Sequence, residues 1–250
     1  MGLFSVNGLA QDNKSIEIGA LGGISYYNGD INPGKPFVQP QPVYGIIGRY
    51  NFTDRWAVKV SLSHGSITGN DKFSKAVLNR NLSFKTDINE IAVTGEFNFM
   101  KYNTGSTMYI FSPYLLGGFS TFQYTPRSLT GTNLRNIGTE GQIIGYRNRK
   151  QYKNYSFALI FGFGFKYSLT KKLGFAVEWG MRKTFTDYLD DISTTYYQNK
   201  VKGLSDPTGK HLKGEQRGNS KTKDWYNFTT ASITYKIDLN KGQNCKKLKW

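Results

Sequence analysis

Two short groups of side chains have types and spacing that could support chemistry. In the first, His64 and Ser66 stand two residues apart, so both project from one face if this segment is a β-strand. A serine becomes a nucleophile when a histidine removes its proton and a third group orients that histidine. Glu90 is the nearest acid on a strand, but alternation puts it on the opposite face. We therefore predict no catalytic role for this pair.

The second group is the acidic stretch FTDYLDDIS, which contains Asp187, Asp190 and Asp191. Carboxylates at this spacing could bind a hard cation such as Ca²⁺. Aspartates at a strand end more often accept hydrogen bonds in turns and caps, and we expect that use here. Cys245 is the single cysteine, so neither an internal disulfide nor a cysteine-based metal cluster is expected. We predict no catalytic residue, no metal site and no cofactor.

Strands would have to position these residues, because apolar side chains recur at every second position along most of the chain. The pattern is clearest in 153–168, where Phe157, Phe161 and Phe163 alternate with small or polar residues. A strand of about 9–11 tilted residues is long enough to cross a bilayer. The pattern predicts eight strands: 16–27, 42–52, 55–66, 86–99, 109–124, 153–168, 173–187 and 222–238.

The connections between these strands alternate in length. The short connections are 53–54, 101–106 and 170–172, and the long ones are 28–41, 67–85, 125–152 and 188–221. Short turns at one end and long loops at the other are typical of barrels in bacterial outer membranes. We therefore predict an all-β fold: an eight-stranded antiparallel transmembrane β-barrel with short periplasmic turns and long extracellular loops.

The polar face of the predicted strands has nearly balanced charge, with four acidic and five basic side chains. A closed interior requires pairing, because removing one partner of a buried ion pair costs roughly 3–5 kcal/mol. A soluble lipocalin-like barrel, the alternative, would turn its apolar face inward and would need no such balance. Eight strands leave a lumen that side chains fill, so a porin is not expected. The predicted lumen network is Glu17, Arg49, Lys59, Glu90, Glu96, Lys166, Glu178, Arg182 and Lys236.

Composition fits this interpretation. The 250 residues include 17 Tyr, 17 Phe and 28 Gly, and no run of 18 or more apolar residues occurs. Aromatic residues near strand ends fit the belts at the two membrane surfaces, for example Tyr26, Tyr27, Tyr155 and Trp225. The formal net charge is +16, much of it in the long loops. Basic loops are attracted to lipid phosphates or to an acidic protein. No nucleic-acid-binding motif accompanies the charge, so nucleic acid is not an expected partner.

Three parts of the chain are expected. Residues 1–10 resemble the last part of a secretory signal peptide, with a short apolar run before Gly8, Leu9 and Ala10. Residues 11–239 would form the barrel, and 240–250 a basic periplasmic tail.

Several stretches resemble the PorG-like outer-membrane proteins of Bacteroidota, a component family of the type IX secretion system. They are YYNGDINP at 26–33, RKTFTDYLDDIS at 182–193, and Cys245 in a short basic tail. The resemblance implies a non-enzymatic anchor in the outer membrane. The partners that it implies are the periplasmic ring proteins of the machine, which include a lipoprotein. Outer-membrane lipid and lipopolysaccharide are expected partners on a different ground, the barrel's place in the membrane and its basic loops. The barrel geometry places possible periplasmic contacts at Asp54, Arg55, Lys171, Lys172, Cys245 and Trp250.

Two alternatives stay open. The first is a surface receptor or adhesion barrel that binds ligands through its long basic loops. The second is an outer-membrane enzyme that modifies lipid A, because His64 and Ser66 are arranged similarly to the outward-facing His/Ser pair of lipid deacylases.

Overall fold

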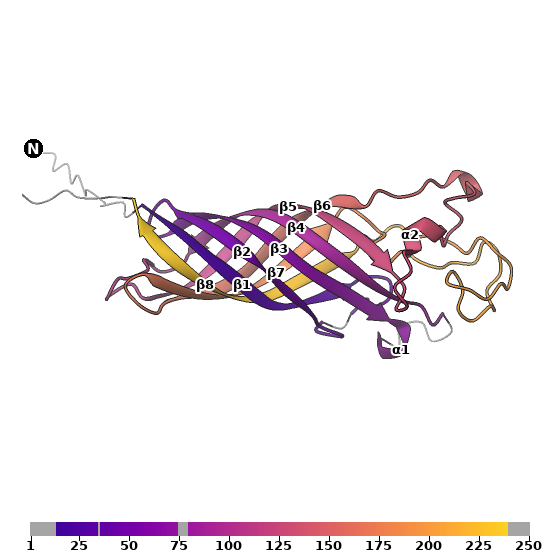
Figure 1. Cartoon of the computed structure of the whole chain (residues 1–250), viewed down its shortest axis with the longest axis horizontal. Coiled ribbons are helices and arrows are strands. Elements are labelled where there is room, and N and C mark those ends of the chain that lie inside the picture. Colours follow the sequence, from indigo (N-terminus) through magenta and orange to yellow (C-terminus); the bar gives the residue numbers. More distant parts are fainter. Residues whose placement is uncertain (1–13, 35, 75–79, 240–250) are drawn as a thin grey trace, which may run out of the picture.

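The computed structural model describes residues 14–34, 36–74 and 80–239. Its eight antiparallel strands are hydrogen-bonded in sequence order and close into one barrel (Figure 1), which confirms the predicted fold. No helix within the described residues is long and apolar enough to cross a membrane. The strands are β1 (Ser15–Asn28), β2 (Gln41–Asn51), β3 (Trp56–Asn70), β4 (Ser83–Asn98), β5 (Phe111–Arg127), β6 (Tyr155–Ser168), β7 (Leu173–Thr184) and β8 (Trp225–Asp238), with short helices α1 (Asp71–Ser74), α2 (Leu134–Ile137) and η1 (Tyr146–Asn148).

The strand register determines how far the strands tilt. Directly paired residues can be followed once around the barrel, from strand to strand. A path that starts at Trp225 of β8 comes back to β8 at Tyr235, ten residues further along. At ~3.3 Å per residue this stagger is about 33 Å, against a circumference of about 38 Å for eight strands. The strands therefore tilt by about 40° to the barrel axis, as small barrels do. The path is Trp225, Lys183, Leu159, Phe119, Val93, Val60, Gly48, Ile18 and Tyr235.

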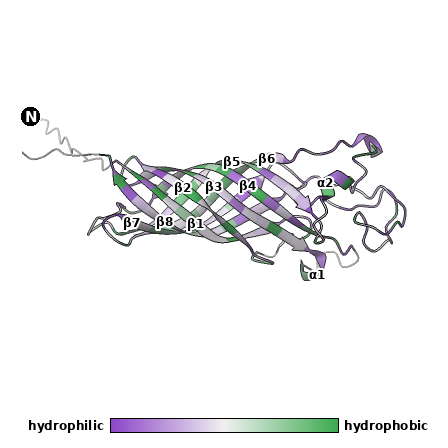
Figure 2. Cartoon of the chain, viewed as in Figure 1, coloured by the Kyte–Doolittle hydropathy of each residue, from purple (hydrophilic) through white to green (hydrophobic). Residues whose placement is uncertain are grey.

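The outer wall of the barrel is apolar. Phe157 and Phe163 are 58 % and 43 % exposed, and the small or polar residues between them face inward. In Figure 2 apolar residues recur along the barrel wall, whereas the loop end is more polar. From Tyr155 to Tyr167 the tilted strand rises about 30 Å, the thickness of a bilayer's hydrocarbon core. This orientation excludes the soluble alternative, in which the phenylalanines would fill the core.

The two ends of the barrel differ as predicted. Connections 52–55, 99–110 and 169–172 lie at one end, where Leu239 N also donates a hydrogen bond to Lys14 O. Four long connections lie at the other end. Strands β3 and β4 run beyond their predicted limits, to Asn70 and from Ser83. Strand pairing continues there, but the row of exposed apolar side chains stops. The apolar alternation therefore did not predict these strand ends.

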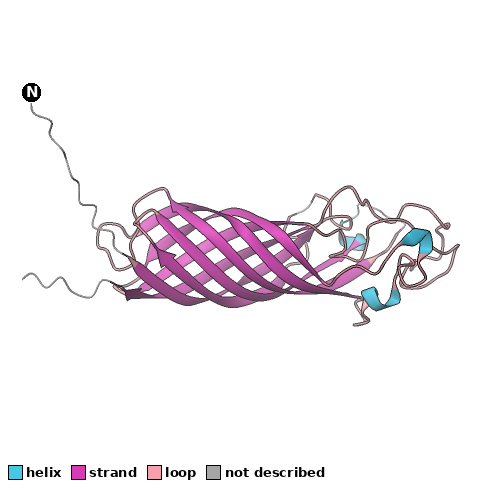
Figure 3. Cartoon of the chain, turned by 90° about the horizontal axis from the view of Figure 1, so that it is seen from above, coloured by secondary structure: helices cyan, strands magenta, loops and turns pink. Residues whose placement is uncertain are grey.

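The described residues of the four long connections pack together at this end of the barrel (Figure 3), and we call them the loop cap: 29–34 with 36–40, 71–74 with 80–82, 128–154 and 185–224. Arg80 links three of these connections. Its guanidinium donates to Asp71 Oδ1 at 2.8 Å, to Arg217 O at 2.7 Å and to Asp30 O at 2.9 Å. An apolar cluster that includes Phe84, Phe122 and Leu189 lies beneath the cap.

Two tyrosines expected in an aromatic belt are buried instead. Tyr27 faces inward, and its hydroxyl donates to Asp190 Oδ2 and Asp224 Oδ1 at 2.6 and 2.9 Å. Tyr26 is on the outward face, but Phe37 of the first loop covers it with a ring distance of 4.5 Å. Strand parity alone could not show that a loop folds back over the wall.

Candidate functional site

The lumen contains a network of ion pairs centred on Glu96, which is fully buried. Arg49 Nε, Lys166 Nζ and Lys59 Nζ lie 2.8, 2.6 and 3.4 Å from its carboxylate oxygens. Arg49 also contacts Glu17 Oε2 at 2.6 Å, and Lys59 contacts Glu178. Six charged side chains from β1 to β7 therefore form one connected group across the lumen.

A second ion pair lies nearer the loop cap. Arg182 binds Glu90 through Nε and Nη2, both at 3.2 Å. The Tyr226 hydroxyl donates to the same carboxylate at 2.5 Å, and the guanidinium lies 4.2 Å from the Phe228 ring centre. Aromatic rings therefore cover this pair.

Lys236 lies apart from both groups. Its ammonium donates to Asn103 Oδ1 at 2.6 Å and to Thr104 O at 2.9 Å in the short connection 99–110. It also pairs at 2.9 Å with Asp238, whose side chain is 59 % exposed. The structure thus brings eight of the nine predicted lumen charges into two buried groups and leaves Lys236 at the short-turn mouth.

Side chains fill the space between the two groups. A cavity of about 20 Å³ lies there, with Lys59, Glu178 and Arg182 in its lining. A volume of this size holds about one water molecule. This part of the lumen is therefore a packed polar core.

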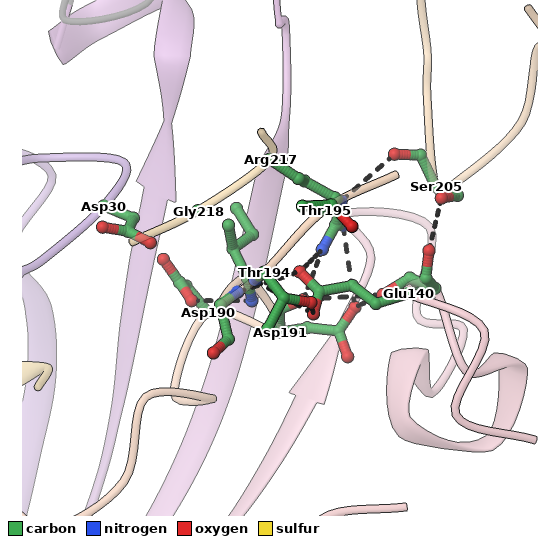
Figure 4. Close-up of polar contacts among 12 residues, drawn as sticks. Asp30, Glu140, Asp190, Asp191, Thr194, Thr195, Ser205, Arg217 and Gly218 are labelled. Carbon is green, nitrogen blue, oxygen red and sulfur yellow. Dashed lines mark hydrogen bonds and ion pairs between the residues drawn. The ribbon is translucent and has the colours of Figure 1, made fainter. Parts of the chain in front are cut away.

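A third polar group lies in the loop cap and was missed by sequence reasoning (Figure 4). Glu140 is fully buried, accepts hydrogen bonds from the backbone N–H groups of Ser193 and Thr194 at 2.9 Å, and pairs with Arg217 at 3.1 Å. Arg217 also donates to Asp191 O at 2.6 Å. These contacts join connections 128–154 and 185–224. Loop sequences carry no periodicity, so no sequence signal distinguished these charges from solvated ones.

The aspartates of FTDYLDDIS do not converge. Asp190 accepts from Tyr27, whereas Asp191 Oδ1 accepts from the Tyr152 hydroxyl at 2.6 Å. Burial raises the pKa of Asp187 to about 7 and of Asp191 to about 6, and holds the pKa of Asp190 and Asp224 well above the usual range. Within the described residues, no three His, Cys, Asp or Glu side chains are placed to hold a metal ion.

His64 and Ser66 are both on the outward parity of β3, but they have different surroundings. His64 Nδ1 lies 2.7 Å from Asn89 Oδ1, so its partner is an amide and not a carboxylate. Ser66 is 8 % exposed, and no hydrogen bond among the described residues joins it to His64. Glu90 points into the lumen, as strand alternation predicted.

The predicted periplasmic contacts lie at the short-turn end. Arg55 donates to Phe99 O at 2.7 Å, and the Asp54 carbonyl accepts from Tyr102 N at 2.9 Å. Lys171 and Lys172 are exposed. The remaining two contacts, Cys245 and Trp250, lie outside the described residues, as do the predicted signal remnant and basic tail.

Solved structures similar to this chain are barrels of bacterial proteins. The N-terminal β-barrel domain of Pseudomonas aeruginosa OprF is 15 % identical, with a TM-score of 0.42, and the match covers 90 % of this chain and 98 % of that one. For the outer membrane protein OprG of the same organism the values are 14 %, 0.41, 91 % and 99 %. For Ail of Yersinia pestis, solved with the heparin analogue sucrose octasulfate, they are 12 %, 0.41, 90 % and 97 %.

No curated protein matches the chain. A family model described as "Domain of unknown function (DUF6089)" matches residues 2–246. This match covers the whole barrel and its loop cap, and the chain belongs to the DUF6089 family.

Proposed function

We propose that this protein is a non-conducting barrel of the bacterial outer membrane that acts as an anchor and not as a pore or an enzyme. The observation that carries the proposal is the lumen. Glu96 with its three cationic partners fills the cross-section where a channel would have to run. Partners are then available only at the outer wall, the loop cap and the short-turn end.

The PorG-like resemblance supports a more specific role as a structural component of the type IX secretion system. Its partners would be the periplasmic ring proteins, including a lipoprotein. The exposed cations of the short-turn end, Arg55, Lys171 and Lys172, support this assignment, because a partner on the periplasmic side could contact their charged groups.

Site-specific crosslinking in intact cells tests this role. A photoreactive residue at Lys171 or Arg55 should capture ring proteins, and the matched control at Leu212, an exposed residue of the loop cap, should not. A deletion strain should lose secretion of type IX cargo. Normal secretion in that strain, or equal capture from both ends of the barrel, would contradict the proposal.

A specific observation also favours the second candidate, a surface receptor. The loop cap has a hydrogen-bonded interior and yet exposes large apolar side chains, with Ile143 57 % and Ile144 70 % exposed. Exposed apolar groups on an ordered surface are a common mark of a binding site. If this role is correct, Ile143→Ser with Ile144→Ser should abolish ligand capture on whole cells and leave secretion intact.

Lipid modification is the third and least supported role. His64 would need a carboxylate or an equivalent group to orient it as a base, and it has Asn89. His64→Ala should therefore leave the mass of lipid A in cells unchanged, and a shift in that mass would instead establish an enzyme.

A further inference from the structure

A groove of about 580 Å³ lies on the outer wall of the barrel, across β2 to β6 and beneath the loop cap. One register row runs through it. Tyr44 is paired with His64, His64 with Asn89, Asn89 with Gln123, and Gln123 with Tyr155. Five strands thus bring together five side chains that no sequence motif links.

The middle of this row is polar on a wall whose exposed side chains are mostly apolar. His64 Nδ1 and Asn89 Oδ1 are 2.7 Å apart, and the Tyr44 ring lies 5.4 Å from the imidazole. Three side-chain groups of the row have no hydrogen-bond partner among the residues that the structure describes: His64 Nε2, Asn89 Nδ2 and the side-chain amide of Gln123. Polar groups that face hydrocarbon without a partner are costly. The row therefore indicates a ligand that offers hydrogen-bonding groups at this depth.

The side chains on the two sides of this polar row differ in character, apolar on one side and cationic on the other. On the side towards the middle of the barrel, the neighbouring register row is exposed and apolar over β2 to β4, and Thr121 continues it on β5. On the side towards the loop cap, Lys85, Arg127 and Lys153 are exposed cations. Arg127 has an acidic partner, Asp87 at 3.7 Å, so this end keeps a net positive charge of two. Lys153 Nζ lies 5.4 Å from the Tyr155 ring centre. The apolar row is Ile46, Leu62 and Ile91.

We propose that this groove binds a phosphorylated, multiply acylated glycolipid of the outer leaflet, the lipid A part of lipopolysaccharide. Its phosphates meet Lys85 and Arg127, its amide and ester groups meet His64, Asn89 and Gln123, and its acyl chains cover the apolar row. The five strands span about 19 Å, enough for several hydrocarbon chains side by side. The inference rests on the proposed outer-membrane location and is independent of any role in secretion.

Native mass spectrometry of the purified full-length barrel in detergent, with lipid A added, tests the site. The variant Lys85→Gln with Arg127→Gln should bind lipid A on the order of tenfold more weakly, because it loses two charge contacts. Lys183→Gln is the matched control, since Lys183 is an exposed cation on β7, outside the groove. A second variant, Asn89→Leu with Gln123→Leu, should also weaken binding, although it makes the wall more apolar.

Two further lipids sharpen the result. Lipid A without phosphates should bind as weakly as the charge variant, and phosphatidylglycerol should bind less than lipid A because it has two acyl chains. Equal binding by wild type and both groove variants would overturn the site, and equal binding of lipid A and phosphatidylglycerol would overturn the assignment to lipid A. Secretion is scored separately in the deletion strain, so its failure leaves this measurement unaffected.

Discussion

The barrel lumen and the loop cap both bury carboxylates, but they neutralise them in different ways. In the lumen, Glu17, Glu90 and Glu96 each lie within 3.2 Å of an arginine or lysine nitrogen. In the cap, Asp187 and Asp190 have no cation within ion-pair distance among the described residues. Every acid of the lumen network has an opposite charge beside it, whereas the described part of the cap combines ion pairs, such as Glu140 with Arg217, with buried aspartates that have no cation beside them. Changes of pH near neutrality should therefore act on these aspartates of the cap.

The largest expected effect comes from breaking the centre of the lumen network. Glu96→Leu leaves Arg49, Lys59 and Lys166 with one buried acid fewer. Loss of one partner of a buried ion pair should lower the free energy of unfolding by roughly 3–5 kcal/mol. Urea unfolding in detergent measures this, with loss of the heat-modifiable gel shift as the readout. A variant as stable as wild type would show that the network is not required for folding.

Removing the central cation of the cap should have a large but local effect. Arg217→Met leaves Glu140 buried without its ion-pair partner. Amide exchange at Ser193 and Thr194 should become about a hundredfold faster, because a local opening needs ~3 kcal/mol less. Amides of β4 and β5 should keep their protection. Equal acceleration in barrel and cap would show that the two regions unfold together.

A change of pH should also separate the regions. The pKa of Asp187 is raised to about 7 and that of Asp191 to about 6, above the value of an unfolded aspartate. These two groups therefore bind more protons in the folded cap, so the stability that they contribute is fully present below about pH 4 and is lost as pH rises through about 6 to 7. Proteolysis of 128–154 and 185–224 should be faster at pH 8 than at pH 5. Asp187→Asn should reduce this difference, and a cap that is more resistant at pH 8 would reverse the sign.

The smallest effect is expected at Lys236, which stands outside both lumen groups. Its partner Asp238 is well exposed, so the ion pair itself contributes about 0–1 kcal/mol. Lys236→Met also removes the hydrogen bonds to Asn103 and Thr104, so it should lower the free energy of unfolding by about 1–2 kcal/mol, less than Glu96→Leu, for which it serves as the matched control. If Lys236→Met lost as much free energy of unfolding as Glu96→Leu, the loss would depend on where a charge lies in the lumen and not on its ion pairs.

Much of the barrel could be predicted because strand alternation is a local property. All eight strands, the outward face of β6 and the alternation of turn and loop lengths follow from side-chain types at every second position. The strand ends do not follow from this alternation. β3 stays paired with β4 as far as Asn70, beyond the last residue of its apolar pattern.

For the candidate sites too, sequence reasoning predicted only what depends on strand parity. Parity identified Glu96 and Arg182 as inward-facing, but it could not say that Glu96 has three cationic partners or that Lys236 lies apart. Tyr27 shows the limit of local reasoning, since its partners Asp190 and Asp224 are 163 and 197 residues away in sequence.

The sequence by itself determined how many strands there are and which face of most of them is apolar, because both depend on neighbours one or two residues apart; in β5 aromatic residues occupy both parities, so its faces stayed ambiguous. Only the tertiary structure decided which charges pair, how four loops share one buried core, and that His64, Asn89 and Gln123 form a row on the wall. Those arrangements depend on strand stagger and loop packing, which join residues far apart in the chain.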